Sequence, residues 1–195
     1  DRESLLESMQ EAGIGRIVNI GADLASTASS IALAEKYPFI YAAAGVHPSD
    51  AAQLNEHTFQ WLSEQTAHEK VVAVGEIGLD YYWEKDSEVR ANQRYWFRRQ
   101  LNLAREKVLP VSIHSRDAAK DTLDIAKEER LAEIGGVVHC FSYTVEMARE
   151  YLNMGMYLGI GGVLTYKNAR VLKEVVDYAP MDRIVLETDS PYLTP

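Results

Sequence analysis

The sequence predicts an α/β protein in which parallel strands alternate with helices, as in a (β/α)8 TIM barrel. Short apolar runs without polar alternation, which are typical of strands buried on both faces, alternate with longer amphipathic segments. Acidic and histidine side chains follow directly after several of these runs, which is where such a barrel carries its polar residues. An open doubly wound sheet often has a glycine-rich phosphate loop, and the sequence contains none.

The first half of the chain is expected to contain three strands and four helices. Gly13 ends the first helix, and Pro38 blocks the continuation of the second. The longest helix carries Val89, Trp96 and Leu103 at intervals of seven residues, which places them on one apolar face. The predicted strands of this half are 17–20, 39–46 and 71–76, and the predicted helices are 2–12, 27–37, 55–68 and 87–107.

The second half continues the same alternation. Its predicted strands are 111–114, 137–140, 157–160 and 184–187, and its predicted helices are 118–127, a segment from Val145 that Gly155 ends, and 171–176. Together the two halves supply seven strands, whereas a closed barrel of this type has eight. Because the chain opens on a helix, we expect the missing strand to precede residue 1. Residues 1–195 would then be a single barrel domain that is truncated at both ends.

Composition narrows the class of protein. A length of 195 residues favours one domain, and the net charge of −9 argues against a general nucleic-acid coat. That charge does not exclude a phosphate substrate held locally by metal ions. Cys140 is the only cysteine, so no intrachain disulfide can form and a cytoplasmic location is expected. No apolar run approaches the roughly 20 residues of a membrane span, no signal peptide opens the chain, and no obligate protein partner is evident.

Four predicted strand ends carry residues that commonly bind metals. Glu76, His114 and His139 follow or end buried strands, and Asp189 lies just beyond the last one. Each histidine taken alone is more typical of a hydrogen-bonded core residue, but two histidines and two acids at one face of a barrel favour a metal site. Cys140 alternates with His139 and is assigned to packing. A donor set without thiolate indicates Mg²⁺, Mn²⁺ or Zn²⁺.

Several neighbouring residues leave alternatives open. Glu76 and Asp80 share strand parity, as do Glu187 and Asp189, so one member of each pair could bind the metal while the other orients a neighbouring group. His47 lies in a turn before a proline, where a role in the site and a role in the turn are equally supported. The aromatic run 81–83 either stacks a base or caps the barrel rim, and the rim is favoured. The arginines of helix 87–107 are interpreted as a solvated face.

Four motifs at these strand ends resemble the signatures of the TatD family, whose members are metal-dependent hydrolases and deoxyribonucleases of the amidohydrolase-like barrel superfamily. They are 75–81 (GEIGLDY), 113–116 (IHSR), 139–142 (HCFS) and 187–193 (ETDSPYL). Segments 45–48 (GVHP) and 161–165 (GGVLT) also match family positions, so the resemblance runs along the whole chain. The family opens with a strand that bears a His-x-His pair and ends in a further helix, and this chain has neither feature.

The resemblance implies a role for each residue. Glu76 would bridge or bind two divalent metal ions, and His114 and His139 would be metal ligands. Asp189 would bind metal and assist the attacking water, while His47 and Arg116 would hold the substrate phosphate. Without the His-x-His pair, one of the two metal positions would be weakened.

The resulting expectation is a metal-dependent hydrolase that cleaves phosphodiester bonds, in the manner of a TatD-type deoxyribonuclease, with a metal-activated water. DNA or another phosphodiester would be its substrate. Two alternatives remain at this point. The same centre could hydrolyse an amide or ester unrelated to nucleic acid, because fold does not fix function. The barrel could also bind metal without catalysing a reaction.

Overall fold

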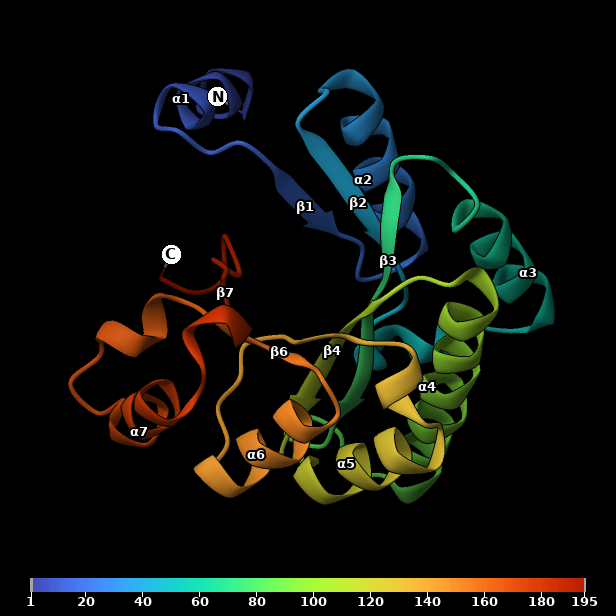
Figure 1. Cartoon of the computed structure of the whole chain (residues 1–195). Coiled ribbons are helices and arrows are strands. Elements are labelled where there is room, and N and C mark those ends of the chain that lie inside the picture. The colour runs from blue at the N-terminus through green and yellow to red at the C-terminus, as the bar shows by residue number, and fades with distance from the viewer. Residues whose placement is uncertain (1, 195) are drawn as a thin grey trace.

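The computed structural model describes residues 2–194, and its seven strands form one parallel sheet. Each strand pairs with the next along the chain, in the order β1 to β7, and Figure 1 shows the sheet curling with helices on its outer side. This arrangement confirms the predicted barrel-type α/β fold. The strands are β1 (Ile17–Ile20), β2 (Ile40–Ala44), β3 (Val71–Asp80), β4 (Val111–Arg116), β5 (Gly136–Val138), β6 (Tyr157–Ile160) and β7 (Ile184–Leu186).

The helices alternate with these strands as the apolar periodicity predicts. They are α1 (Arg2–Glu11), α2 (Leu24–Lys36), α3 (Glu56–Gln65), α4 (Ser87–Lys107), α5 (Ala119–Glu128), α6 (Val145–Asn153) and α7 (Arg170–Tyr178). Short 3-10 helices η1 (Pro48–Gln53), η2 (Leu131–Glu133), η3 (Gly162–Thr165) and η4 (Met181–Arg183) occupy several connections. None of the helices within residues 2–194 has the length and apolar character needed to cross a membrane. An eighth strand before residue 1 remains a prediction.

Two element boundaries differ from the predicted ones in informative ways. Helix α2 begins three residues early because Asp23 caps it: the Asp23 carboxylate accepts the backbone N–H of Ser26, and the Ser26 hydroxyl accepts that of Asp23. Strand β3 continues four residues past Glu76 to Asp80. The pairing register of β3 with β4 shifts between Val74 and Ile77, which is a local irregularity that an apolar run does not reveal.

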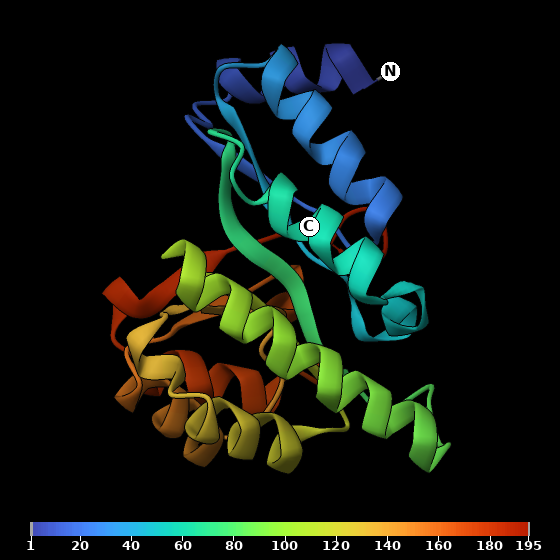
Figure 2. The same cartoon turned by 90° about the vertical axis from the view of Figure 1, so that its right-hand side faces the viewer.

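Helix α4 packs between two apolar clusters and joins them. Phe97 and Leu101 are buried with strands β3 to β6, whereas Trp96 and Leu103 are buried with β2, α2 and α3. Figure 2 shows α4 lying along β3, the longest strand. Val89, the third member of the predicted apolar face, is 40% exposed. A helix that contacts both clusters fixes the position of the sheet segments that each cluster supports.

Two buried glutamines of α4 also form hydrogen bonds to the backbone at the ends of β2 and β3. Gln93 accepts the backbone N–H of Asp80 through Oε1 at 3.1 Å. Gln100 accepts the N–H of Val46 at 2.8 Å and donates to the carbonyl of the same residue at 3.1 Å. Both side chains are at most 2% exposed. Their spacing of seven residues on one helix face is the signal by which this pair could have been found in the sequence.

Candidate metal centre

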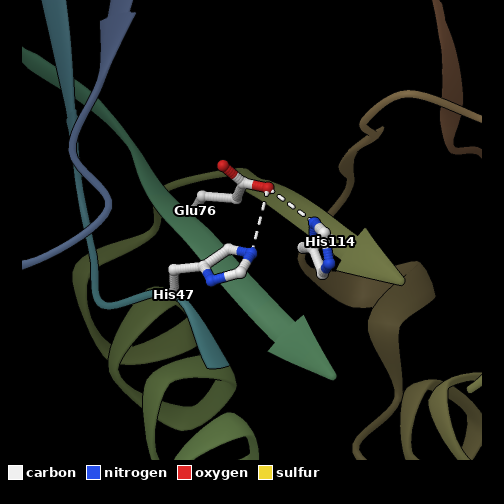
Figure 3. A group of neighbouring side chains, drawn as sticks. All are labelled: His47, Glu76 and His114. Atoms are coloured by element: carbon white, nitrogen blue, oxygen red, sulfur yellow. Dashed lines mark hydrogen bonds and ion pairs between the residues drawn. The ribbon is translucent and has the colours of Figure 1, made fainter. Parts of the chain in front are cut away.

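Three polar side chains meet near the middle of the curled sheet, and Figure 3 shows them pointing toward one another. Glu76 lies within β3, His114 lies within β4, and His47 follows the end of β2. Glu76 Oε1 is 2.9 Å from His114 Nδ1 and 3.8 Å from His47 Nε2. The side chain of Glu76 is only 15% exposed. These three residues offer ligand atoms that all lie within 4.8 Å of one another, as a metal site requires.

His139, which follows β5, and Asp189, which follows β7, extend this group of side chains. His139 Nε2 lies 3.9 Å from Glu76 Oε1 and 3.4 Å from Asp189 Oδ1. A single oxygen of Glu76 is therefore within 4 Å of a ring nitrogen from each of three histidines. The structure thus brings together five of the six residues that the sequence analysis assigned to the site.

Arg116, the sixth residue, does not take part in this cluster. It ends β4 and is exposed, and its guanidinium carbon stands 4.0 Å from the centroid of the Tyr82 ring. Within residues 2–194 it makes no hydrogen bond or ion pair with the residues around Glu76. The aromatic run is also divided, because Tyr81 is buried whereas Tyr82 and Trp83 are exposed. Tyr81 therefore belongs to the core, and the two interpretations, rim and base stacking, stay open for Tyr82 and Trp83 only.

His114 and His139 each contact a second carboxylate through the ring nitrogen that does not face Glu76. Asp80 Oδ2 lies 3.2 Å from His114 Nε2, and Glu187 Oε2 lies 2.7 Å from His139 Nδ1. Glu187 also accepts the backbone N–H of Cys140 at 2.5 Å. This pattern fits the expected division of each acidic pair, with one carboxylate facing the centre and the other fixing the orientation of a ring.

Ionisation in the metal-free protein reflects the crowding of these charges. Burial on its own raises the pKa of Glu76, but the hydrogen bond from His114 and the nearby histidine charges lower it to about 2. Burial on its own lowers the pKa of His139, but the hydrogen bond to Glu187 and the charge of Glu76 raise it to about 9. The pKa of His114 is also raised, because its hydrogen bonds to Asp80 and Glu76 outweigh burial. Near pH 7, a proton on His139 therefore balances carboxylate charge where a cation would otherwise do so.

The donor set fits a divalent cation. Imidazole nitrogens and carboxylate oxygens suit Zn²⁺ and Mn²⁺, and carboxylates also suit Mg²⁺. In the metal-free protein, burial and the charges of Glu187 and Asp189 raise the pKa of the Cys140 thiol. The placement of Cys140 beside His139 and Glu187 differs from a purely apolar packing position.

A barrel-type parallel sheet that collects histidines and carboxylates along its strands has the architecture of a metal-dependent hydrolase. Comparison with known proteins agrees, since the family model described as TatD related DNase matches residues 1–195. The chain belongs to the TatD family and is a metal-dependent hydrolase.

Relatives of known name or structure support this assignment. The uncharacterized metal-dependent hydrolase YabD of Bacillus subtilis is 46% identical over the whole chain, which spans 76% of YabD. A protein named 3'-5' ssDNA/RNA exonuclease TatD, from Cronobacter sakazakii, is 36% identical over the whole chain, which spans 74% of it. The crystal structure of YJJV, a TatD homologue from Escherichia coli, superposes with a TM-score of 0.90 at 34% identity, over 99% of this chain and 74% of YJJV. The match to YcfH of Escherichia coli covers 56% of that relative.

Proposed function

We propose that this hydrolase cleaves phosphodiester bonds of nucleic acid, as a TatD-type deoxyribonuclease that uses a metal-activated water. The observation that carries the proposal is the position of Glu76 Oε1, which lies 2.9, 3.8 and 3.9 Å from ring nitrogens of His114, His47 and His139. A relative that is named an exonuclease acting on single-stranded DNA and RNA supports the choice of a phosphodiester substrate.

In this proposal four residues bind divalent cations, and one of the four also accepts a proton from the attacking water. Glu76, His114, His139 and Asp189 would be the ligands, with two ions in the complete site. When bound, such cations lower the pKa of water toward about 7 and offset negative charge on phosphoryl oxygens. Asp189 would accept the proton of the attacking water. In the metal-free protein, burial and the charge of Glu76 raise the pKa of Asp189 despite the opposing charge of His139.

His47 would orient the substrate phosphate. Its Nδ1 accepts the backbone N–H of Ser49 at 3.2 Å, so in the neutral ring the proton resides on Nε2, which faces Glu76. Burial and the charge of His114 lower the pKa of His47 to about 4, so the ring is neutral near pH 7. A neutral ring with its N–H turned into the site can donate to a phosphate oxygen. Arg116 would contribute a second, charged donor from the rim.

The test replaces Glu76 with alanine and uses Glu106→Ala as the matched control. Glu106 is an exposed residue of α4 that makes no contact with the site. We expect Glu76→Ala to lose bound metal and to lower cleavage of single-stranded DNA at least 100-fold, while Glu106→Ala resembles the parent. Unchanged metal content and unchanged cleavage in Glu76→Ala would refute the proposal. A substrate panel should include duplex DNA and small amides and esters, and turnover of those small substrates alone would replace the nuclease assignment.

A further inference from the structure

Two exposed aromatic rings and one arginine form a small surface cluster beside the candidate centre. Tyr82 is 43% exposed and Trp83 is 73% exposed, and their rings meet edge to face with centroids 4.6 Å apart. The guanidinium carbon of Arg116 lies 4.0 Å from the Tyr82 centroid and 5.6 Å from that of Trp83. Arg116 therefore lies over both of the two nearly perpendicular rings. We call these three residues the aromatic–arginine cluster.

The guanidinium of Arg116 contacts aromatic rings and forms no ion pair with a described carboxylate. Two arginines of α4 differ in this respect, because Arg99 pairs with Glu56 of α3 and Arg98 pairs with Glu129 just after α5. Arg116 has no carboxylate within 4 Å among the described residues, although the chain carries nine more acidic than basic side chains. Lys85 adds a second cation 6.0 Å from the Tyr82 centroid. An exposed cation held against aromatic rings, without its own counter-ion, favours an anionic ligand that also has a flat face.

The aromatic–arginine cluster is tied to the candidate centre by one carboxylate. Asp80 Oδ1 accepts the backbone N–H groups of Tyr82 at 2.9 Å and Trp83 at 3.2 Å, while its Oδ2 lies 3.2 Å from His114 Nε2. Asp80 is 4% exposed, so these bonds are shielded from water. Arg116 follows His114 by two residues on β4. A ligand at the cluster would therefore lie next to a substrate at the centre.

We propose that the aromatic–arginine cluster is a subsite for one nucleotide of a single-stranded nucleic acid. The exposed ring of Trp83 stacks the base, and Arg116 binds the adjoining backbone phosphate. This inference rests on the proposed function, and it adds a reason for preferring unpaired strands: only an unstacked base exposes its face to a protein ring.

The experiment measures binding of a short oligothymidylate by fluorescence anisotropy in the full chain carrying Asp189→Asn, which prevents cleavage during the titration. Trp83→Ala is expected to weaken binding about 10-fold, and Trp83→Phe is expected to restore it, because stacking on an aromatic side chain contributes on that scale per base. Tyr178→Ala removes a ring that is 47% exposed on α7, outside the cluster, and serves as the control. Equal affinities of the Trp83→Ala and Tyr178→Ala proteins would overturn the inference.

Two further measurements separate stacking from other effects. A ligand of the same length in which every nucleotide is abasic should bind the parent and Trp83→Ala equally, because it has no base to stack. If Trp83→Ala weakens both ligands alike, the ring does not recognise a base. Arg116→Met should reduce the dependence of log affinity on log salt by about 0.7, the value for one phosphate of a single strand. An unchanged slope would contradict the phosphate contact.

The outcome for the subsite can be distinguished from that for the reaction. If the unmodified site cleaves no phosphodiester but Trp83 still controls oligothymidylate binding, the proposed function fails and the subsite stands. If the Trp83→Ala protein with native Asp189 cleaves single-stranded DNA with the parent KM, the subsite fails and the function stands. A raised KM with unchanged kcat is the expected result, because stacking remote from the reacting bond contributes equally to ground state and transition state.

Discussion

Replacement of Gln100 with leucine should destabilise the protein through the turn that carries His47. The amide of Gln100 pairs with both the N–H and the carbonyl of Val46, at 2.8 and 3.1 Å. Val46 and Gln100 are each 1% exposed, so water cannot replace these bonds without local opening. Leucine has a similar volume and therefore removes the hydrogen bonds without leaving a large cavity.

The expected loss of stability follows from the two buried hydrogen bonds. A typical intramolecular hydrogen bond contributes about 1 kcal/mol net, and a buried backbone group that loses its partner costs about 1–3 kcal/mol. Because both groups belong to one residue and can relax together, we expect a total of about 2–4 kcal/mol. For a chain of 195 residues this corresponds to a fall in Tm of roughly 4–16 °C.

Urea unfolding followed by circular dichroism measures this free energy, and Gln60→Leu provides the comparison. Gln60 is an exposed residue of α3 that bonds only to Glu64, so its replacement should cost less than about 0.5 kcal/mol. If Gln100→Leu lies within 0.5 kcal/mol of Gln60→Leu, the contact with Val46 does not stabilise the turn. That result would refute the assignment of α4 as the support of this strand end.

Two further predictions concern His139. Glu187→Gln removes the charged hydrogen bond between Glu187 and His139 Nδ1, so metal affinity measured by titration should fall about 10- to 100-fold. An unchanged affinity would contradict the orienting role of Glu187. In metal-free protein, burial lowers the pKa of His139, but the bond to Glu187 and the charge of Glu76 raise it to about 9. Its folded pKa therefore exceeds the unfolded value near 6.5, so its stabilising contribution is complete below about pH 6.5 and is lost as pH rises through 9. Tm measured with chelator present should fall across that interval in the parent and less in Glu187→Gln, and equal slopes would exclude His139 as the cause.

The fold and the residues of the candidate metal centre could be predicted from the sequence because both follow from the burial of parallel strands. Parallel strands covered on both faces must be apolar throughout, so a charged residue in or after such a strand needs a partner. Glu76 and His139 are recognisable by that logic alone. The parity argument likewise anticipates that Asp80 and Glu187 could orient neighbouring groups, because residues two or four apart on a strand project to the same face.

Other features depend on contacts between distant segments and escape a pattern-based reading. The continuation of β3 to Asp80 requires Gly78, whose φ is +147° and whose added Cβ would lie 1.9 Å from the carbonyl oxygen of His114. Only glycine permits that close approach of two strands, and nothing in the apolar run indicates it. The roles of Gln93 and Gln100 are likewise invisible until α4 is placed against two strand ends. Polar residues on an otherwise apolar helix face are the observation that could have raised the question.

Asp80 explains how the candidate centre and the aromatic–arginine cluster can act as one unit. One oxygen of its carboxylate fixes the backbone of Tyr82 and Trp83, and the other fixes the ring of His114. Gln93 in turn accepts the backbone N–H of Asp80, which ties the same point to α4. A shift of the backbone at Tyr82 and Trp83 would therefore disturb the contact between Asp80 and His114. A rotation of the His114 ring would in turn disturb the hydrogen bonds between Asp80 and that backbone. Because the two are coupled through a buried carboxylate, a strand bound at the rim would be held in a fixed register relative to the centre.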